Sequence, residues 1–216
     1  MPRSRAAKYL DQREAILSNA AGLFAHRGYL GTSMNDVAEA CGLSKATLYH
    51  YYRDKDEMLV SIADEHVSRL VELVRSVEKD ESVAPEQRLE TLITRFLIVY
   101  ADAQNSHRVL TEDVKFLEAR DRERILNKER AVVRGFADAI AIHQPQLRDA
   151  SLDKPVAMLL FGMLNWMFTW LKPDGRLTHA SIAPIVCNLF FNGLAGAAAP
   201  AIAAKKPARK RSASAA

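Results

Sequence analysis

Two short helices with recognisable caps and a glycine between them constrain this chain more than any other feature. Ser33 precedes an apolar-periodic segment, and Asp36 stands three residues later, a capping-box spacing that satisfies the first free amides of a helix. Gly42 can adopt the left-handed conformation that closes that helix, and Ser44 then caps a second one. This spacing predicts a helix-turn-helix, whose second helix enters the DNA major groove by its N-terminal end.

The second helix is predicted to present a polar face. Its 3.6-residue period turns Leu48 inward and turns Lys45, Thr47 and Tyr49 outward. Together with His50, these side chains can donate to phosphates or guanine acceptors and can contact the thymine methyl group. The sequence therefore predicts that this face reads double-stranded DNA.

The residues just after this helix allow two interpretations. Lys55 begins the next helix, which Asp54 caps, and we expect it to contact a phosphate. Tyr51 and Tyr52 are either DNA contacts or half-buried rings that pack the helices together.

Residues 10–59 resemble the DNA-binding domain of the tetracycline-repressor (TetR) family. The matching residues are Thr32, Ser33, Val37, Ala38, Cys41, Gly42, Leu43, Ser44, Thr47, Leu48, Tyr49, Tyr51, Tyr52, Lys55 and Leu59. The resemblance implies a three-helix DNA-binding unit on an all-helical dimer. Many relatives have His-Phe where this chain has Tyr51 and Tyr52. The DNA-binding residues are then expected to be Thr32, Ser33, Ser44, Lys45, Thr47, Tyr49, His50, Tyr51 and Lys55.

Beyond this motif the apolar residues keep helical spacing almost to the end, without a strand-like alternation, so the predicted fold is all-α. We divide the chain into a basic N-terminal arm (1–9), a helix-turn-helix domain (10–56), a helical effector-binding and dimerisation domain (57–198) and a basic tail (199–216). The arm and the tail either follow DNA phosphates or remain solvated ends.

The charge and the cysteines support an intracellular DNA-binding protein. The formal net charge is +4, which the tail cations Lys205, Lys206, Arg209, Lys210 and Arg211 more than account for. Cys41 and Cys187 lack the spacing of a metal site, and each is expected to be a small buried residue in a reducing cytoplasm. We expect neither a cofactor nor a metal.

The most apolar part of the chain lies near its end. Residues 155–171, and a second stretch after the turn at 172–176, are apolar around the whole helix and must be enclosed on every side. A membrane span is disfavoured, because the first stretch is short and contains Asn165. We expect these helices to pair with a second copy, so that the dimer reads two half-sites of a palindrome about 34 Å apart.

Aromatic residues in the second domain are candidates for an effector cavity, although each could equally be plain core. Residues 155–194 resemble the TetR branch that controls fatty-acid, steroid or aromatic-acid catabolism and responds to acyl-CoA thioesters. Arginines of the polar run at 120–134 either bind CoA phosphates or form pairs on a solvated helix. The expected effector-binding residues are Phe96, Tyr100, Phe116, Phe161, Asn165, Trp166, Trp170, Arg120 and Arg124, with Phe168 beside them.

These features favour a regulator that a small effector, such as an acyl-CoA thioester, releases from its operator. The alternative is an architectural DNA-binding protein without an effector. An enzyme is not expected, because the sequence has no catalytic constellation, phosphate loop or metal motif.

Overall fold

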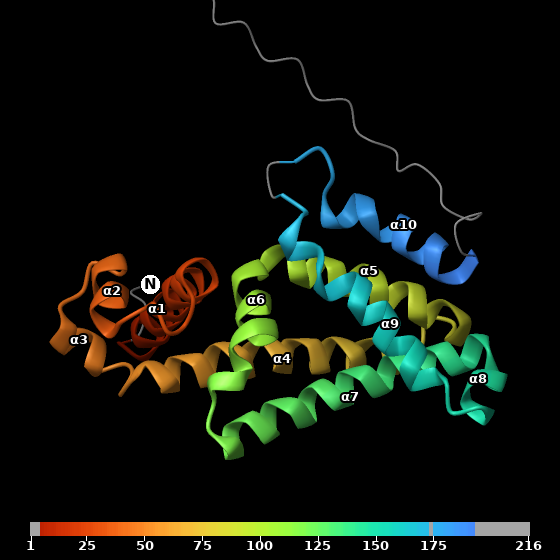
Figure 1. Ribbon diagram of the computed structural model, residues 1–216, viewed down its shortest axis with the longest axis horizontal. Helices are drawn as coiled ribbons and strands as arrows, with labels where there is room; N and C mark the ends of the chain where they lie inside the picture. The colour runs from red at the N-terminus through yellow and green to blue at the C-terminus, as the bar shows by residue number, and fades with distance from the viewer. Residues whose placement is uncertain (1–4, 173–174, 193–216) are drawn as a thin grey trace, which may run out of the picture.

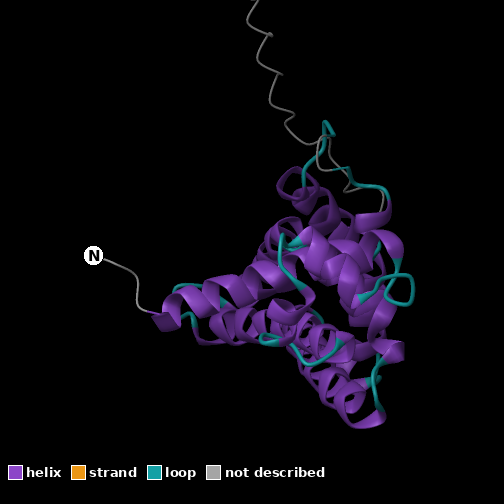
Figure 2. Ribbon diagram, turned by 90° about the vertical axis from the view of Figure 1, so that its left-hand side faces the viewer, coloured by secondary structure: helices purple, strands orange, loops and turns teal. Residues whose placement is uncertain are grey.

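The computed structural model describes residues 5–172 and 175–192, and every regular element in this part of the chain is a helix (Figure 1, Figure 2). The expected all-α fold is therefore confirmed. The basic tail at 199–216 lies outside the described residues.

The first three helices form a compact unit at one end of the molecule (Figure 1). They are α1 (Arg5–Arg27), α2 (Met34–Ala40) and α3 (Lys45–Tyr49). Helix α1 ends at Arg27, and Gly28 directly after it has φ +81°. Because α1 begins at Arg5, the predicted arm of residues 1–9 is corrected: residues 5–9 belong to the first helix.

Helix α4 (Lys55–Lys79) links this unit to the remaining helices. The predicted boundary between residues 56 and 57 thus falls inside one continuous helix. The other elements are η1 (Pro85–Gln87), α5 (Arg88–Asp102), α6 (Gln104–Asp113), η2 (Val114–Phe116), α7 (Ala119–His143), α8 (Pro145–Asp149), α9 (Asp153–Asn165), η3 (Met167–Thr169) and α10 (His179–Asn192).

The second domain packs around the C-terminal part of α4. Helices α5, α6 and α7 contact α4 directly, α9 lies on α7, and α10 lies on α5. Three buried rings, Phe96, Phe136 and Phe161, lie together in this core. The Phe136 ring centroid is 4.7 Å from that of Phe96 and 4.8 Å from that of Phe161. Helix α6 also packs on α1, so it connects the two domains.

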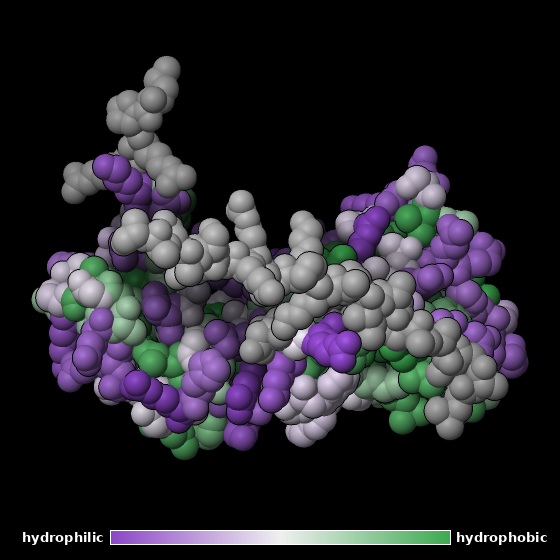
Figure 3. All heavy atoms as spheres, turned by 90° about the horizontal axis from the view of Figure 1, so that it is seen from above, coloured by the Kyte–Doolittle hydropathy of each residue, from purple (hydrophilic) through white to green (hydrophobic). Residues whose placement is uncertain are grey.

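The apolar stretch at 155–171 is not one helix. Helix α9 ends at Asn165, and the chain continues as the 3-10 turn η3, which buries Met167 and leaves Trp166 exposed. Apolar composition alone did not predict this end. No helix of the described part is long and apolar enough to span a bilayer. Apolar side chains reach the surface on the side that carries α10 (Figure 3), and the large exposed ones on α9 and α10 are Met158, Leu159, Met163 and Phe191.

Candidate DNA interface and effector cavity

The helix-turn-helix caps form as the sequence predicts. The Ser33 hydroxyl accepts from the Asp36 amide, and the Asp36 carboxylate accepts from the Ser33 amide at 2.7 Å. Gly42 has φ +65°, and the Ser44 hydroxyl accepts from the Thr47 amide at 3.1 Å. These bonds fix where α3 begins and therefore which of its side chains face outward.

The outward face of α3 is open to a partner. Lys45 and His50 are exposed, and Tyr49 is 46% exposed. Leu48 is fully buried, which confirms the predicted orientation of the helix. The Thr47 hydroxyl lies 2.8 Å from that of Ser44. Lys45, Tyr49 and His50 are therefore the α3 side chains most available to a DNA groove.

Two residues that the sequence assigned to DNA contact are used within the protein, and this is a correction. Thr32 is 2% exposed, and its hydroxyl donates to the Gly28 carbonyl at 2.9 Å. The Lys55 ammonium donates to the carbonyls of Tyr29 and Thr32, at 2.7 and 2.8 Å, and lies over the Tyr29 ring. The Thr32 hydroxyl and two of the three Lys55 donors therefore satisfy the backbone between α1 and α2.

The tyrosines around α3 also take up packing roles. Tyr51 is partly buried, and its ring stacks on that of Tyr9 at 4.9 Å, a contact that sequence reasoning missed. Tyr52 is buried, and the Arg13 side chain donates to its hydroxyl at 3.0 Å. Both rings therefore hold α1 against the end of the helix-turn-helix.

A cavity of about 160 Å³ lies between the helices of the second domain and is partly open to the surface, where Met158 in its lining is 53% exposed. Of the expected effector residues, Tyr100, Phe161 and Asn165 line it. Sequence reasoning missed the other lining residues, which are Val67, Leu70, His107, Leu110, Thr111, Glu129, Val132, Val133 and Met158. A usable signal was present for His107, because it lies on the same helix face as Leu110 and interrupts an apolar stripe.

One wall of the cavity is polar. The Tyr100 hydroxyl donates to Asn165 Oδ1 at 2.9 Å, and the His107 ring stacks on Tyr100 at 3.7 Å. His107 Nδ1 lies 3.3 Å from His66 Nε2, and the second nitrogen of each ring is buried without a hydrogen-bond partner in the described part of the chain.

Burial controls the titration of the groups around this wall. It lowers the pKa of His66 to about 4. It also lowers the pKa of His107 to about 3, with a further contribution from His66 and an opposing one from the Asn165 backbone. Burial raises the pKa of Glu129. Both histidines are therefore neutral near pH 7, and the cavity wall offers hydrogen bonds without positive charge.

The structure places the remaining expected effector residues elsewhere, which corrects their predicted grouping. Phe96 is buried one layer behind Phe161, at 6.2 Å between centroids. Phe116 stacks on Tyr29 of the DNA-binding unit at 5.6 Å. The other four are exposed. Trp166 follows α9, and Trp170 lines a different cleft. Arg120 and Arg124 lie on α7, where Arg124 forms ion pairs with Asp64 and Asp121.

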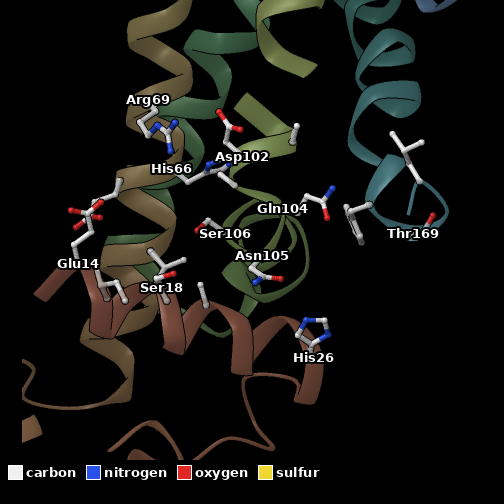
Figure 4. A pocket seen from close by; sticks show the side chains of 18 of the residues that line it. Glu14, Ser18, His26, His66, Arg69, Asp102, Gln104, Asn105, Ser106 and Thr169 are labelled. Atoms are coloured by element: carbon white, nitrogen blue, oxygen red, sulfur yellow. The ribbon is translucent and has the colours of Figure 1, made fainter. Parts of the chain in front are cut away.

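That second cleft, of about 780 Å³, lies between α1 and the second domain (Figure 4). Glu14 and Ser18 reach it from α1, while His66 and Arg69 reach it from α4 (Figure 4). Its carboxylates, Glu14, Glu65 and Asp102, oppose the cations Arg69 and Lys172. This mixed lining is a poor match for several phosphate groups at once.

The described residues contain no cluster of His, Cys, Asp and Glu that could hold a metal ion. Cys41 and Cys187 are free thiols, the second of them buried.

Two family models match the chain. One, described as bacterial regulatory proteins of the tetR family, matches residues 16–62. The other, described as the tetracyclin repressor-like C-terminal domain, matches residues 82–194, more than half of the chain.

Individual relatives match over most of their length. A TetR-family transcriptional regulator from Bordetella parapertussis is 32% identical with a TM-score of 0.82, over 87% of this chain and 97% of that one. The transcriptional repressor KstR2 of Rhodococcus jostii is 25% identical over 85% of this chain and 91% of its own. AibR, solved with isovaleryl coenzyme A and operator DNA, is 29% identical with a TM-score of 0.67, over 80% and 94%.

Proposed function

The chain belongs to the TetR family of bacterial regulatory proteins, a family of transcriptional regulators and not of enzymes, and we propose that it is a repressor that a small effector releases from DNA. The observation that carries this proposal is the continuity of α4. Its first residue, Lys55, is bonded to the turn before α2, and its residues Val67 and Leu70 line the cavity. A shift of this helix at the cavity therefore moves the DNA-binding unit.

The operator in this proposal is a palindrome bound by a homodimer. A single α3 reads only a few base pairs, whereas a symmetric pair reads two half-sites about one helical turn apart. The exposed apolar residues of α9 and α10 supply the pairing face, and Leu159 is its most exposed member at 71%. Two copies of α9 and α10 then form a four-helix interface.

Effector binding acts by population shift. A ligand that fits the cavity better in one subunit arrangement than in another favours the first arrangement by the difference in binding free energy. If the favoured arrangement places the two α3 helices at a spacing that does not match the DNA groove, the free energy of operator binding is weakened by this same difference. The partly open cavity between the helices supports this regulator over an architectural protein, which needs no ligand site.

We propose an acyl-CoA thioester as the effector. A structural relative binds isovaleryl coenzyme A together with operator DNA. The cavity of this chain pairs an apolar lining with the amide of Asn165 and the hydroxyl of Tyr100, which suits an acyl group with one carbonyl. Arg120 and Arg124 lie outside it, so they are not its phosphate ligands.

Fluorescence anisotropy with DNA from upstream of the protein's own gene tests this proposal. We expect sequence-specific binding that isovaleryl-CoA weakens and free CoA does not. Footprinting is expected to show a palindromic protected site. Binding that no CoA thioester alters, with no protein stabilisation by any of them, would instead favour the architectural alternative.

A further inference from the structure

The size of the cavity in the second domain, which we call the inner cavity, limits what can occupy it. Its volume of about 160 Å³ is close to that of a cavity of about 150 Å³ in another protein that binds benzene. At about 30 Å³ for each water-sized group, it holds roughly five such groups. A single ring or a short branched chain fits within this space, whereas a long chain or fused rings would project out of it.

The wall behind the cavity is too well packed to lengthen it cheaply. Phe161 separates the cavity from the buried ring cluster, where it contacts Phe136 at 4.8 Å and Phe96 at 6.2 Å. Phe96 and Phe136 are both fully buried. A ligand that extended past Phe161 would have to displace these close-packed rings.

The chemistry of the lining excludes a free carboxylate. None of the described residues that line the cavity is Lys or Arg, and Glu129 contributes an acid. His107 is held neutral by burial. A carboxylate placed here would be a buried charge without a cation, which is strongly unfavourable. The occupant of the cavity is therefore uncharged.

Asn165 supplies a donor on the polar wall that is available to a carbonyl. Asn165 Oδ1 already accepts from Tyr100, which leaves the amide Nδ2 to donate, and no partner for it is found among the described residues. Asn165 is partly exposed and ends α9. It lies just before Phe168 and Trp170, which line the cleft of about 780 Å³ between α1 and the second domain. The chain that follows Asn165 thus leads from the cavity to this cleft.

We infer that the effector inserts a compact, uncharged acyl group, either a short branched chain or a single ring, with its carbonyl oxygen accepting from Asn165. This inference rests on the proposed function and narrows it, because it excludes long-chain fatty acyl and steroid acyl groups. The neutral arm that follows the thioester then runs toward Gln104, Asn105 and Ser106 in the cleft (Figure 4).

Calorimetric titration of the full-length protein with isovaleryl-CoA, benzoyl-CoA, lauroyl-CoA and free CoA tests the inference. We expect the first two to bind at least tenfold more tightly than lauroyl-CoA, and free CoA and free isovalerate to bind more weakly still. Lauroyl-CoA binding as tightly as isovaleryl-CoA would overturn the size limit while leaving a CoA-responsive regulator in place.

Two substitutions of Val133 test whether thioester binding takes place in the inner cavity. Val133→Phe fills the cavity and should weaken isovaleryl-CoA at least tenfold, whereas Val133→Ala enlarges it and should improve lauroyl-CoA relative to isovaleryl-CoA. Val71→Phe is the control, because Val71 is also partly buried but lies in a groove outside this cavity. Unchanged thioester binding in Val133→Phe, with its fold verified by circular dichroism, would overturn the assignment.

Toluene tests whether a single ring enters the cavity, independently of whether the protein binds any CoA thioester. Stabilisation of the wild type by toluene, lost in Val133→Phe, would show that a single ring enters the cavity. If no thioester binds, the proposed effector class fails and the acyl assignment fails with it, whatever toluene does.

Discussion

Replacement of Leu159 by glutamate tests the pairing face directly. Leu159 is 71% exposed on α9, so most of its side chain is available for burial against a second subunit. Full burial of a leucine contributes about 1.5–3 kcal/mol, so this exposed share contributes about 1–2 kcal/mol. A two-fold interface contains the residue twice, which gives a loss of about 2–4 kcal/mol and a dimer dissociation constant roughly 30- to 1,000-fold higher.

Sedimentation velocity over a dilution series measures this constant. Leu30→Glu is the matched control, because Leu30 is 73% exposed but lies between α1 and α2, away from α9 and α10. We expect Leu159→Glu to become a folded monomer at concentrations where Leu30→Glu remains dimeric. If both variants dimerise as tightly as the wild type, α9 is not at the interface and the four-helix arrangement is wrong.

Three further predictions concern the DNA unit and the buried histidines. Tyr49→Ala and Lys45→Met should each weaken operator binding by about 1–3 kcal/mol in anisotropy titrations without changing thermal stability, and unchanged operator affinity in both variants would place the reading surface elsewhere. Lys55→Met should instead lower the free energy of unfolding by about 2 kcal/mol in urea titrations, because two charge-assisted hydrogen bonds to backbone carbonyls are lost. Lys45→Met is the control, because it replaces an exposed lysine on α3. His66 and His107 have folded pKa values of about 4 and about 3, against about 6.5 when unfolded, so the unfolded chain binds more protons below pH 6.5. The free energy of unfolding should therefore fall by up to about 1.4 kcal/mol per pH unit for each histidine between about pH 6.5 and 4, and a His66→Phe, His107→Phe double variant should flatten that decline.

The sequence alone predicted the parts of the fold that local chemistry determines. Ser33, Asp36 and Ser44 cap their helices because the bonds they make span three residues, a distance that the sequence states directly. Gly42 takes positive φ for an equally local reason. The buried state of Leu48 follows from helical period once α3 is placed.

Long-range contacts decided what the sequence could not. Thr32 and Lys55 have donors that suit a phosphate or a carbonyl equally well, and only the folded turn shows that backbone carbonyls take them. Phe116 is aromatic like Phe161, but η2 brings it to Tyr29 and not to the cavity. Composition identifies aromatic residues without showing which helices meet, so the candidate cavity was predicted only in part.

The role of Lys55 explains how a change in the second domain can reach DNA. A cation at a helix N-terminus is unfavourable for the helix dipole, so its position on α4 needs another cause. That cause is the pair of carbonyls at Tyr29 and Thr32, reinforced by the bond from the Tyr29 hydroxyl to Asp56, the next residue in the first turn of α4. The Tyr29 ring also stacks on Phe116, which follows α6. Helix α4 and the η2 turn that follows α6 therefore meet at Tyr29, and we expect the three N-terminal helices to move with them as one body.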